Sequence, residues 1–151
     1  MSHEQKNIGP LAGVRILDLS TMIAAPYGAA LLGDFGAEVI KIEMPGTGDS
    51  LRSMGPFKGD EPLRWPTLAR NKKSLTLDLR TEPGKEILKK LVAQSDVVIE
   101  NFRTGTLERW GIGYEDLKKV NKDLIMIRVT GYGQTGPYKH KAGFGTPATA
   151  F

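Results

Sequence analysis

The sequence predicts an α/β protein in which helices flank a parallel β-sheet. Short apolar runs of strand length alternate along the chain with segments whose apolar residues recur at helical spacing. At 151 residues, with 40% hydrophobic and 25% charged residues, the chain has the size and composition of one soluble domain with its own core. Strands that alternate with helices at these intervals indicate parallel strands joined by right-handed crossovers.

The first part of the chain is expected to form a strand, a helix and a second strand. Residues 14–20 read as a buried strand, and a helix opens near Pro26, whose missing N–H does no harm in a first turn. Glycines at 33–36 stop this helix, and the second strand covers residues 38–43. Prolines and glycines without a sustained period predict an ordered surface excursion over residues 50–67.

The second half of the chain continues the alternation. The leucines in residues 74–80 alternate with polar side chains, so we expect one face of a strand to join the core. Thr81 is the expected N-cap of the next helix, with Pro83 just inside it. The remaining expected elements are a strand at 97–99, a short helix at 106–110, an amphipathic helix at 115–121 and a strand at 124–130.

Basic residues are concentrated in one stretch. Residues 70–90 contain seven cations and three anions, a surplus equal to the net charge of +4 of the whole chain. Arg70, Lys72 and Arg80 flank a strand, and both phosphate binding and structural ion pairs remain open for them. A solvated surface is expected for the lysines on the polar helix face, Lys85, Lys89 and Lys90. This mild surplus is compatible with an anionic small molecule and too weak to indicate nucleic acid.

Other kinds of site receive little support. Residues 131–136 match G-x-G-x-x-G, but Pro137 follows at once, so we expect a tight loop, with a dinucleotide oxidoreductase as the weaker alternative. We expect no metal site, because the chain has no cysteine and only two histidines, both in expected loops. Asp18 leaves a buried structural role and a functional role open, whereas Asp78 is expected to form a salt bridge with Arg80. No apolar run approaches a membrane span of about 18 residues, and no targeting segment opens the chain.

Several collinear motifs together resemble those of the family III CoA-transferases (CaiB/BaiF, formyl-CoA transferase-like). The motifs are LAGVRILDLS at 11–20, AAP at 24–26, LGDFGAEVIKIE at 32–43, GD at 48–49, NKKSLTLDL at 71–79, DVVIENF at 96–102 and GYGQTGP at 131–137. The resemblance implies a flexible tail at 1–9 and a Rossmann-like CoA-binding domain at 10–151. It also implies that this domain is the N-terminal part of a longer, cytoplasmic chain that forms an interlocked homodimer.

The activity implied by the resemblance is transfer of coenzyme A from an acyl-CoA donor to a carboxylic acid through an aspartyl-CoA thioester. None of the aspartates in this chain matches the family's nucleophile, which the resemblance places beyond Phe151. We therefore expect the 151-residue chain alone to be inactive. The alternative is a non-catalytic CoA- or nucleotide-binding module that acts with a partner chain.

The resemblance also implies a set of CoA-binding positions. Ala24 matches a backbone position near the thioester end of CoA, and Arg109 matches a phosphate contact. Lys141 falls near a basic position that precedes an aromatic residue, here Phe144. A segment that lines the CoA nucleotide is matched by Leu77, Asp78, Leu79 and Arg80. The exit of the next strand, beside CoA, is matched by Asn101, Phe102 and Arg103. Two departures affect local contacts: Met44 stands where some members have arginine, and Gly145 where many have aspartate.

Overall fold

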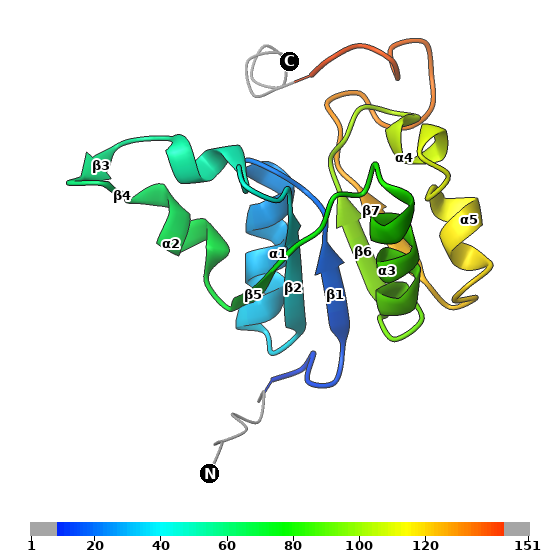
Figure 1. The fold of residues 1–151 in the computed structure, drawn as a ribbon, viewed down its shortest axis with the longest axis horizontal. Helices are drawn as coiled ribbons and strands as arrows, with labels where there is room; N and C mark the ends of the chain where they lie inside the picture. Colours follow the sequence, from blue (N-terminus) through cyan, green and yellow to red (C-terminus); the bar gives the residue numbers. More distant parts are fainter. Residues whose placement is uncertain (1–8, 144–151) are drawn as a thin grey trace.

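Five parallel strands form the centre of the fold (Figure 1). The computed structural model describes residues 9–143. The strand order across the sheet is β5-β2-β1-β6-β7, with β1 in the middle and later strands added outward on both sides. Their bounds are β1 Arg15–Asp18, β2 Glu38–Glu43, β5 Lys72–Thr76, β6 Val97–Glu100 and β7 Ile125–Arg128. This is the Rossmann-like α/β arrangement, and it confirms the predicted fold class.

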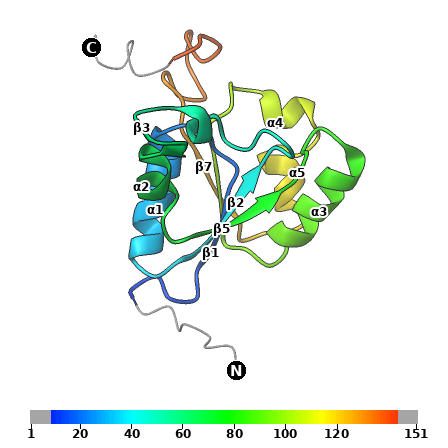
Figure 2. The same cartoon turned by 60° about the vertical axis from the view of Figure 1, so that its left-hand side comes forward.

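Helices cover both faces of the sheet (Figure 2). On one face lies α1 Ala24–Asp34, with α2 Arg64–Ala69 beside it. The other face carries α3 Glu82–Val92, α4 Thr106–Arg109 and α5 Tyr114–Lys118. Two apolar clusters fill the space between these layers, because alternate residues of a strand point to opposite faces.

Neighbouring residues of one strand show this division. Ile16 of β1 packs with Ala25 and Ala29 of α1, whereas Leu17 packs with Leu88 of α3 and the other residues of the larger cluster. Small residues in α1 therefore allow close packing on the sheet.

The strand predicted at 74–80 differs from the observed one. β5 begins at Lys72 and ends at Thr76, and within residues 9–143 it pairs only with β2, so it is an edge strand of the described sheet. Leu75 is 36% exposed at this edge, whereas Leu77 and Leu79 are buried after the chain has left the sheet. The alternation of leucines was thus a poor guide to the strand, because two of them pack from the turn that leads into α3.

That turn is held by the start of α3. The Thr81 hydroxyl accepts a hydrogen bond from the Gly84 N–H at 3.2 Å, which confirms the predicted N-cap. A Cβ at Gly84 would collide with the Asp78 carbonyl, so only glycine allows this close approach. The loop from Leu77 to Arg80 is therefore fixed against the first turn of a helix.

The surface excursion predicted at 50–67 contains more regular structure than its sequence suggests. It holds a short 3₁₀ helix, η1 Ser50–Ser53, and a hairpin made by β3 Phe57–Lys58 and β4 Glu61–Pro62, and it runs into α2. These elements are too short to give a period in the sequence. Arg52 also stacks on the Trp65 ring at 3.8 Å, which joins η1 to α2.

Candidate functional site

The carboxyl ends of the strands form the edge at which a ligand site is expected. In open parallel sheets, ligands bind where neighbouring strands connect in opposite directions, and here β1 and β6 are those neighbours. Asn101 joins the two loops that leave this point. Its side-chain oxygen accepts from the Thr21 N–H at 2.9 Å, and its amide donates to the Thr21 carbonyl at 2.7 Å. Asn101 thus holds the mouth of the crevice in one shape.

A cavity of about 100 Å³ lies beside this point, lined by residues of the apolar cluster that also contains Leu88 of α3 and Leu107 of α4. It is smaller than the about 300–1,000 Å³ of a typical ligand pocket, so it suits one part of a larger ligand. The walls are mostly apolar, with polar groups from β2 and the loop after it. The lining residues are Leu19, Thr21, Lys41, Ile42, Glu43, Met44, Gly48, Asp49, Leu77, Leu79, Arg80, Phe102 and Trp110.

Four of the residues that the resemblance implied come together at this cavity. Leu77, Leu79 and Arg80 follow β5, and Phe102 follows β6. Phe102 meets Trp110 edge to face, with ring centroids 5.4 Å apart and an interplanar angle of 66°. The two rings form an aromatic wall, and Trp110 was not singled out from the sequence.

Arg80 and Asp78 form the local salt bridge that the sequence predicted. The guanidinium donates from Nε and Nη2 to the two carboxylate oxygens at 2.9 and 2.8 Å. Hydrogen bonds from the Arg80 side chain and backbone lower the pKa of Asp78 to about 2. Arg80 remains 58% exposed at the cavity mouth, so its charge is oriented by Asp78 and still faces solvent.

The other implied residues lie outside the cavity lining. Ala24 is exposed at the start of α1, and Arg103 is exposed in the loop after β6. Arg109 is exposed on α4 and donates to the Thr106 hydroxyl at 2.9 Å. Lys141 lies over the Tyr138 ring, 3.8 Å from its centroid. Phe144 and Gly145, also named from the resemblance, lie outside the described residues, whereas Met44 lines the cavity.

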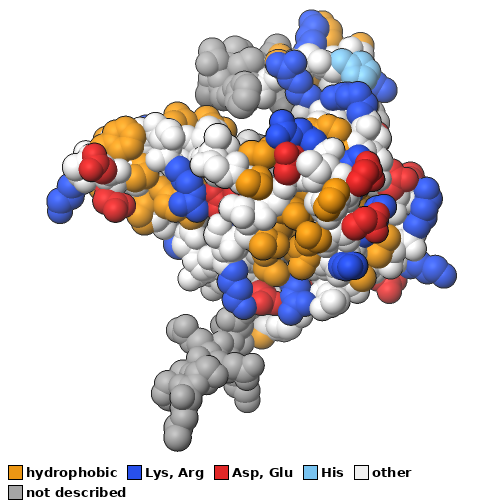
Figure 3. All heavy atoms as spheres, viewed as in Figure 1, with side chains coloured by type: hydrophobic (Ala, Val, Ile, Leu, Met, Phe, Trp, Pro, Cys, Tyr) orange, Lys and Arg blue, Asp and Glu red, His pale blue; other side chains and the backbone are white. Residues whose placement is uncertain are grey.

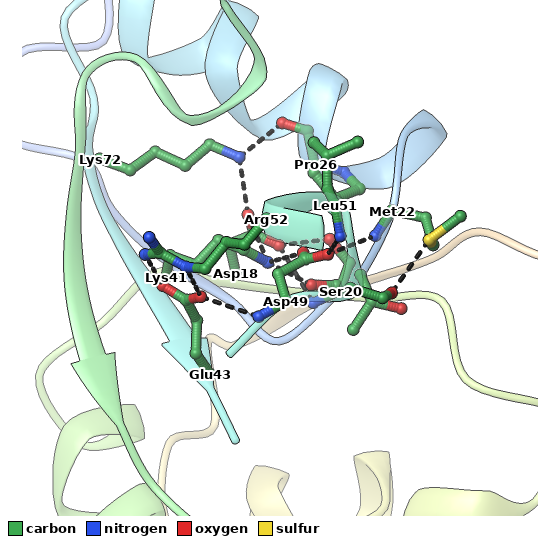
Figure 4. A network of polar contacts seen from close by, with 12 residues as sticks. Asp18, Ser20, Met22, Pro26, Lys41, Glu43, Asp49, Leu51, Arg52 and Lys72 are labelled. Atoms are coloured by element: carbon green, nitrogen blue, oxygen red, sulfur yellow. Dashed lines mark hydrogen bonds and ion pairs between the residues drawn. The ribbon is translucent and has the colours of Figure 1, made fainter. Parts of the chain in front are cut away.

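A buried polar network lies next to the cavity (Figure 4). Asp18, at the end of β1, accepts hydrogen bonds from the Ser20 N–H and hydroxyl and, at 2.8 Å, from Lys72 Nζ of β5. Lys41 Nζ of β2 lies 2.9 Å from Asp49 Oδ2 and 3.9 Å from Asp18 Oδ2. Asp49 Oδ2 therefore forms an ion pair with Lys41, but it accepts no hydrogen bond from any described residue.

The network balances its charges: two aspartates face two lysines, all four side chains 2% exposed or less. Burial lowers the pKa of Lys72, although the attraction and hydrogen bond of Asp18 oppose this change. Asp18 therefore has the buried, hydrogen-bonded role, one of the two left open by the sequence. Lys72 likewise has a structural role, because it also donates to the Pro26 carbonyl of α1 at 2.6 Å.

Glu43, the last residue of β2, anchors the loop that follows it. Its carboxylate accepts two hydrogen bonds from Arg52, at 2.7 and 2.8 Å, one from the Ser74 hydroxyl at 2.7 Å and one from the Asp49 N–H at 2.9 Å. Burial acts to raise the pKa of Glu43, but these hydrogen bonds, led by that of Arg52, prevail and lower it to about 2. The cavity wall formed by residues 43–49 thus depends on an ionised Glu43.

Most of the basic surplus of residues 70–90 is paired with carboxylates. Six of its seven cations have an acidic partner within 4.0 Å, and Arg70, Lys72 and Lys73 take theirs from α1, β1 and β2. On the face drawn in Figure 3, cations are accordingly spread over the surface, many beside carboxylates. Of the three cations considered for phosphate, only Arg80 reaches the cavity. Charge counted along the chain missed the partners of Arg70, Lys72 and Lys73, because these carboxylates lie on α1, β1 and β2.

The glycines at 131–136 form a loop, as predicted. No helix follows them within the described residues up to Gly143. Gly133 and Gly136 have φ values of 76° and 82°, which favour glycine. Gly131 lies against the backbone of Gly143, where a Cβ would come within 2.7 Å of the Gly143 Cα.

The range of residues 9–143 contains no group of three or more His, Cys, Asp or Glu side chains able to hold a metal ion. It also contains no helix long and apolar enough to cross a membrane.

Of the residues in the cavity and the polar network, some carried a signal in the sequence and others did not. Lys41 stands inside the apolar run from Val39 to Ile42, and a cation at a core position was a usable signal for a buried ion pair. Trp110, Leu19 and Thr21 gave no comparable signal, because their approach to the cavity depends on how loops fold back.

A parallel sheet with an apolar cavity and an exposed arginine at its carboxyl edge places this chain among the open α/β folds, in which ligands commonly bind at that edge. The chain belongs to CoA-transferase family III, whose family model matches residues 11–151. It is 58% identical over 139 residues to succinyl-CoA--D-citramalate CoA-transferase of Chloroflexus aurantiacus, covering 91% of this chain and 34% of that protein. It is 45% identical over 148 residues to human succinyl-CoA:glutarate CoA-transferase, covering 97% of this chain and 34% of that protein.

A solved structure agrees with this assignment. The crystal structure of a CaiB/BaiF family protein from Brucella suis superposes with a TM-score of 0.84 at 42% identity, covering 90% of this chain and 37% of that one. The chain thus spans about a third of the length of the curated relatives it matches. Family membership, predicted from the motifs, is confirmed.

Proposed function

We propose that the complete protein transfers coenzyme A from an acyl-CoA thioester to a carboxylic acid. Membership of CoA-transferase family III supports this reaction class. The observation that carries the proposal is the cavity at the carboxyl edge of the sheet, where Leu77, Leu79 and Phe102 form apolar walls and Arg80 stands at the mouth. Succinyl-CoA is the first donor to test, because both relatives named above carry it in their names.

CoA combines an aromatic ring system with phosphates, and the cavity offers a partner for each. Its apolar walls suit one ring of the nucleotide, while Arg80 at the mouth suits a phosphate. Arg103 and Arg109, exposed on the chain that follows Phe102, extend the positive charge along the same edge. Leu77, Asp78, Leu79 and Asn101 act in this proposal by shaping and orienting the cradle. The remaining proposed contacts to CoA come from Ala24 and Lys141.

The chemistry that we propose is a covalent relay through an aspartate. A carboxylate oxygen attacks the thioester carbonyl, which forms a mixed anhydride and releases CoA thiolate. The thiolate then attacks the aspartyl carbonyl, so the donor acid leaves and an aspartyl-CoA thioester remains. The acceptor carboxylate repeats these steps in reverse, and the thioester energy is kept.

The nucleophilic aspartate is proposed to lie beyond Phe151. The two buried aspartates beside the cavity, Asp18 and Asp49, are poor candidates, because both face lysines in ion pairs. The 151-residue chain alone is therefore expected to be inactive. The complete protein is proposed to work in the cytoplasm as an interlocked homodimer.

Isothermal titration of the complete protein with CoA tests the binding site. Arg80→Ala and Arg109→Ala each remove a proposed charge-assisted contact of about 1.5–3 kcal/mol. Each should therefore raise the Kd about tenfold to a hundredfold. Arg64→Ala is the matched control, because Arg64 is exposed on α2, on the other face of the sheet, and its loss should leave the Kd unchanged. Unchanged affinity in both test variants would contradict the proposed site.

The alternative, a CoA-binding module that acts with a partner chain, makes a different prediction. Such a protein binds CoA with the same dependence on Arg80 but transfers none from succinyl-CoA to a dicarboxylic acid. Reading the coding sequence past Phe151 separates the two proposals directly. Absence of an aspartate-bearing continuation would remove the relay mechanism and favour the module.

A further inference from the structure

Arg128, the last residue of β7, binds two carboxylates that belong to different elements. Its Nε donates to Glu100 Oε1 at 2.6 Å, and its Nη1 and Nη2 donate to the two oxygens of Glu108 at 2.7 and 3.1 Å. Glu100 ends β6 and Glu108 lies on α4. One guanidinium therefore joins two strands of the sheet to the helix that covers their carboxyl ends.

Each of these carboxylates lies two residues before one ring of the aromatic wall. Glu100 is fully buried, and its second oxygen accepts the Phe102 N–H at 2.6 Å, which sets the turn that presents the Phe102 ring. Glu108 holds α4, at whose end Trp110 stands. Phe102 and Trp110 line the cavity, whereas Arg128 does not.

Arginine is the side chain that this position requires. Its planar guanidinium spreads donors over a fork wide enough for both carboxylates, whereas a lysine ammonium is a compact point charge that could serve one of them. Arg128 also supplies the opposite charge that fully buried Glu100 needs, because a buried carboxylate without a partner is strongly destabilising. Gly113 leaves room for the Glu108 side chain, since a Cβ there would come within 2.9 Å of Glu108 Cγ.

We propose that Arg128 is a positioning residue for acyl-CoA binding: through Glu100 and Glu108 it fixes the distance between Phe102 and Trp110, and with it the aromatic wall of the cavity. The inference rests on the proposed function and adds to it a residue that does not touch the ligand. The effect falls on ligand binding, because the two rings line the cavity and do not carry the reacting carboxylate.

Two substitutions in the complete protein test this role. Arg128→Lys keeps a positive charge for Glu100 and loses the fork to Glu108. Glu108→Ala releases α4 from the other side, at a position that is 46% exposed, so folding should be preserved even if the first variant does not fold. Both should raise KM for acyl-CoA and Kd for CoA about five- to tenfold while kcat changes less than about twofold.

Arg15→Lys is the matched control. Arg15 also bridges two elements, by hydrogen bonds to Glu38 at 2.6 Å and to the Gln94 carbonyl at 3.1 Å, but at the opposite end of the sheet. It should leave KM and Kd unchanged. A purely structural role for Arg128 would lower the unfolding midpoint and leave KM as in the wild type, and that result in Glu108→Ala overturns the proposal.

The outcome also separates this inference from the function on which it rests. Wild-type protein that binds no CoA refutes the proposed function. Wild-type protein that binds CoA, with equal affinity in Glu108→Ala, refutes only the role of Arg128. Glu108→Gln keeps one acceptor for the guanidinium and should recover part of the lost affinity, which a nonspecific disturbance of α4 would not explain.

Discussion

Replacing Glu43 by glutamine should remove the part of the pH dependence of the free energy of unfolding that comes from this residue. Glu43 is 2% exposed and accepts hydrogen bonds from Arg52, Ser74 and the Asp49 N–H. The pKa of Glu43 is lowered from an ordinary value of 4.5 to about 2 in the folded protein. Glutamine resembles the protonated carboxyl in shape and lacks its negative charge, so it reports what the ionised form contributes.

The magnitude follows from the two pKa values. A folded-state pKa below the unfolded-state pKa means that the stabilisation is fully present above pH 4.5 and is lost as the pH falls through about 2. At about 1.4 kcal/mol for each tenfold change in proton affinity, the interval corresponds to about 3 kcal/mol. The free energy of unfolding of the wild type minus that of Glu43→Gln should therefore be about 3 kcal/mol larger at neutral pH than near pH 2.

Urea unfolding of the complete protein from about pH 2 to about pH 7 measures this difference. Glu61→Gln serves as the control, because Glu61 is exposed on β4 and forms no ion pair with any described residue. The difference in the free energy of unfolding, wild type minus Glu43→Gln, should rise between about pH 2 and about pH 4.5 and then stay level. A difference that is independent of pH would refute the argument, since it would mean that Glu43 titrates alike in the folded and unfolded states.

Three further substitutions test the network, the crevice and the core. Lys72→Met removes one of the two lysines that face the buried aspartates and leaves Asp18 without its nearest cation. The free energy of unfolding should therefore fall by about 3–5 kcal/mol in urea titrations. A change below about 1 kcal/mol would argue against a structural role for Lys72. Asn101→Ala removes both hydrogen bonds to Thr21, which hold the two loops at the mouth of the crevice. The affinity for CoA should therefore fall about tenfold in calorimetry. An affinity equal to that of the wild type would contradict this role of Asn101. Leu88→Ala empties a fully buried site in α3 and should lower stability by about 2–5 kcal/mol with the Kd for CoA unchanged.

Local rules were reliable where a segment's own residues decide its structure. Thr81 caps α3 as predicted, because its partner, the Gly84 N–H, is three residues away. Pro26 lies in the first turn of α1, and the glycines of residues 131–136 form a loop, for equally local reasons. The collinear motifs identified the family, and the family implied the Rossmann-like fold.

Sequence by itself determined the α/β class, most helices and strands, the salt bridge of Asp78 with Arg80 and the family. Only the tertiary structure decided what the basic stretch does, because the carboxylates that pair with Arg70, Lys72 and Lys73 lie 35 to 54 residues earlier in the chain. It also decided the site: Arg80 and Phe102, 22 positions apart, meet at one cavity only because parallel strands present their carboxyl ends at the same edge. Such contacts depend on strand order, which residue spacing does not encode.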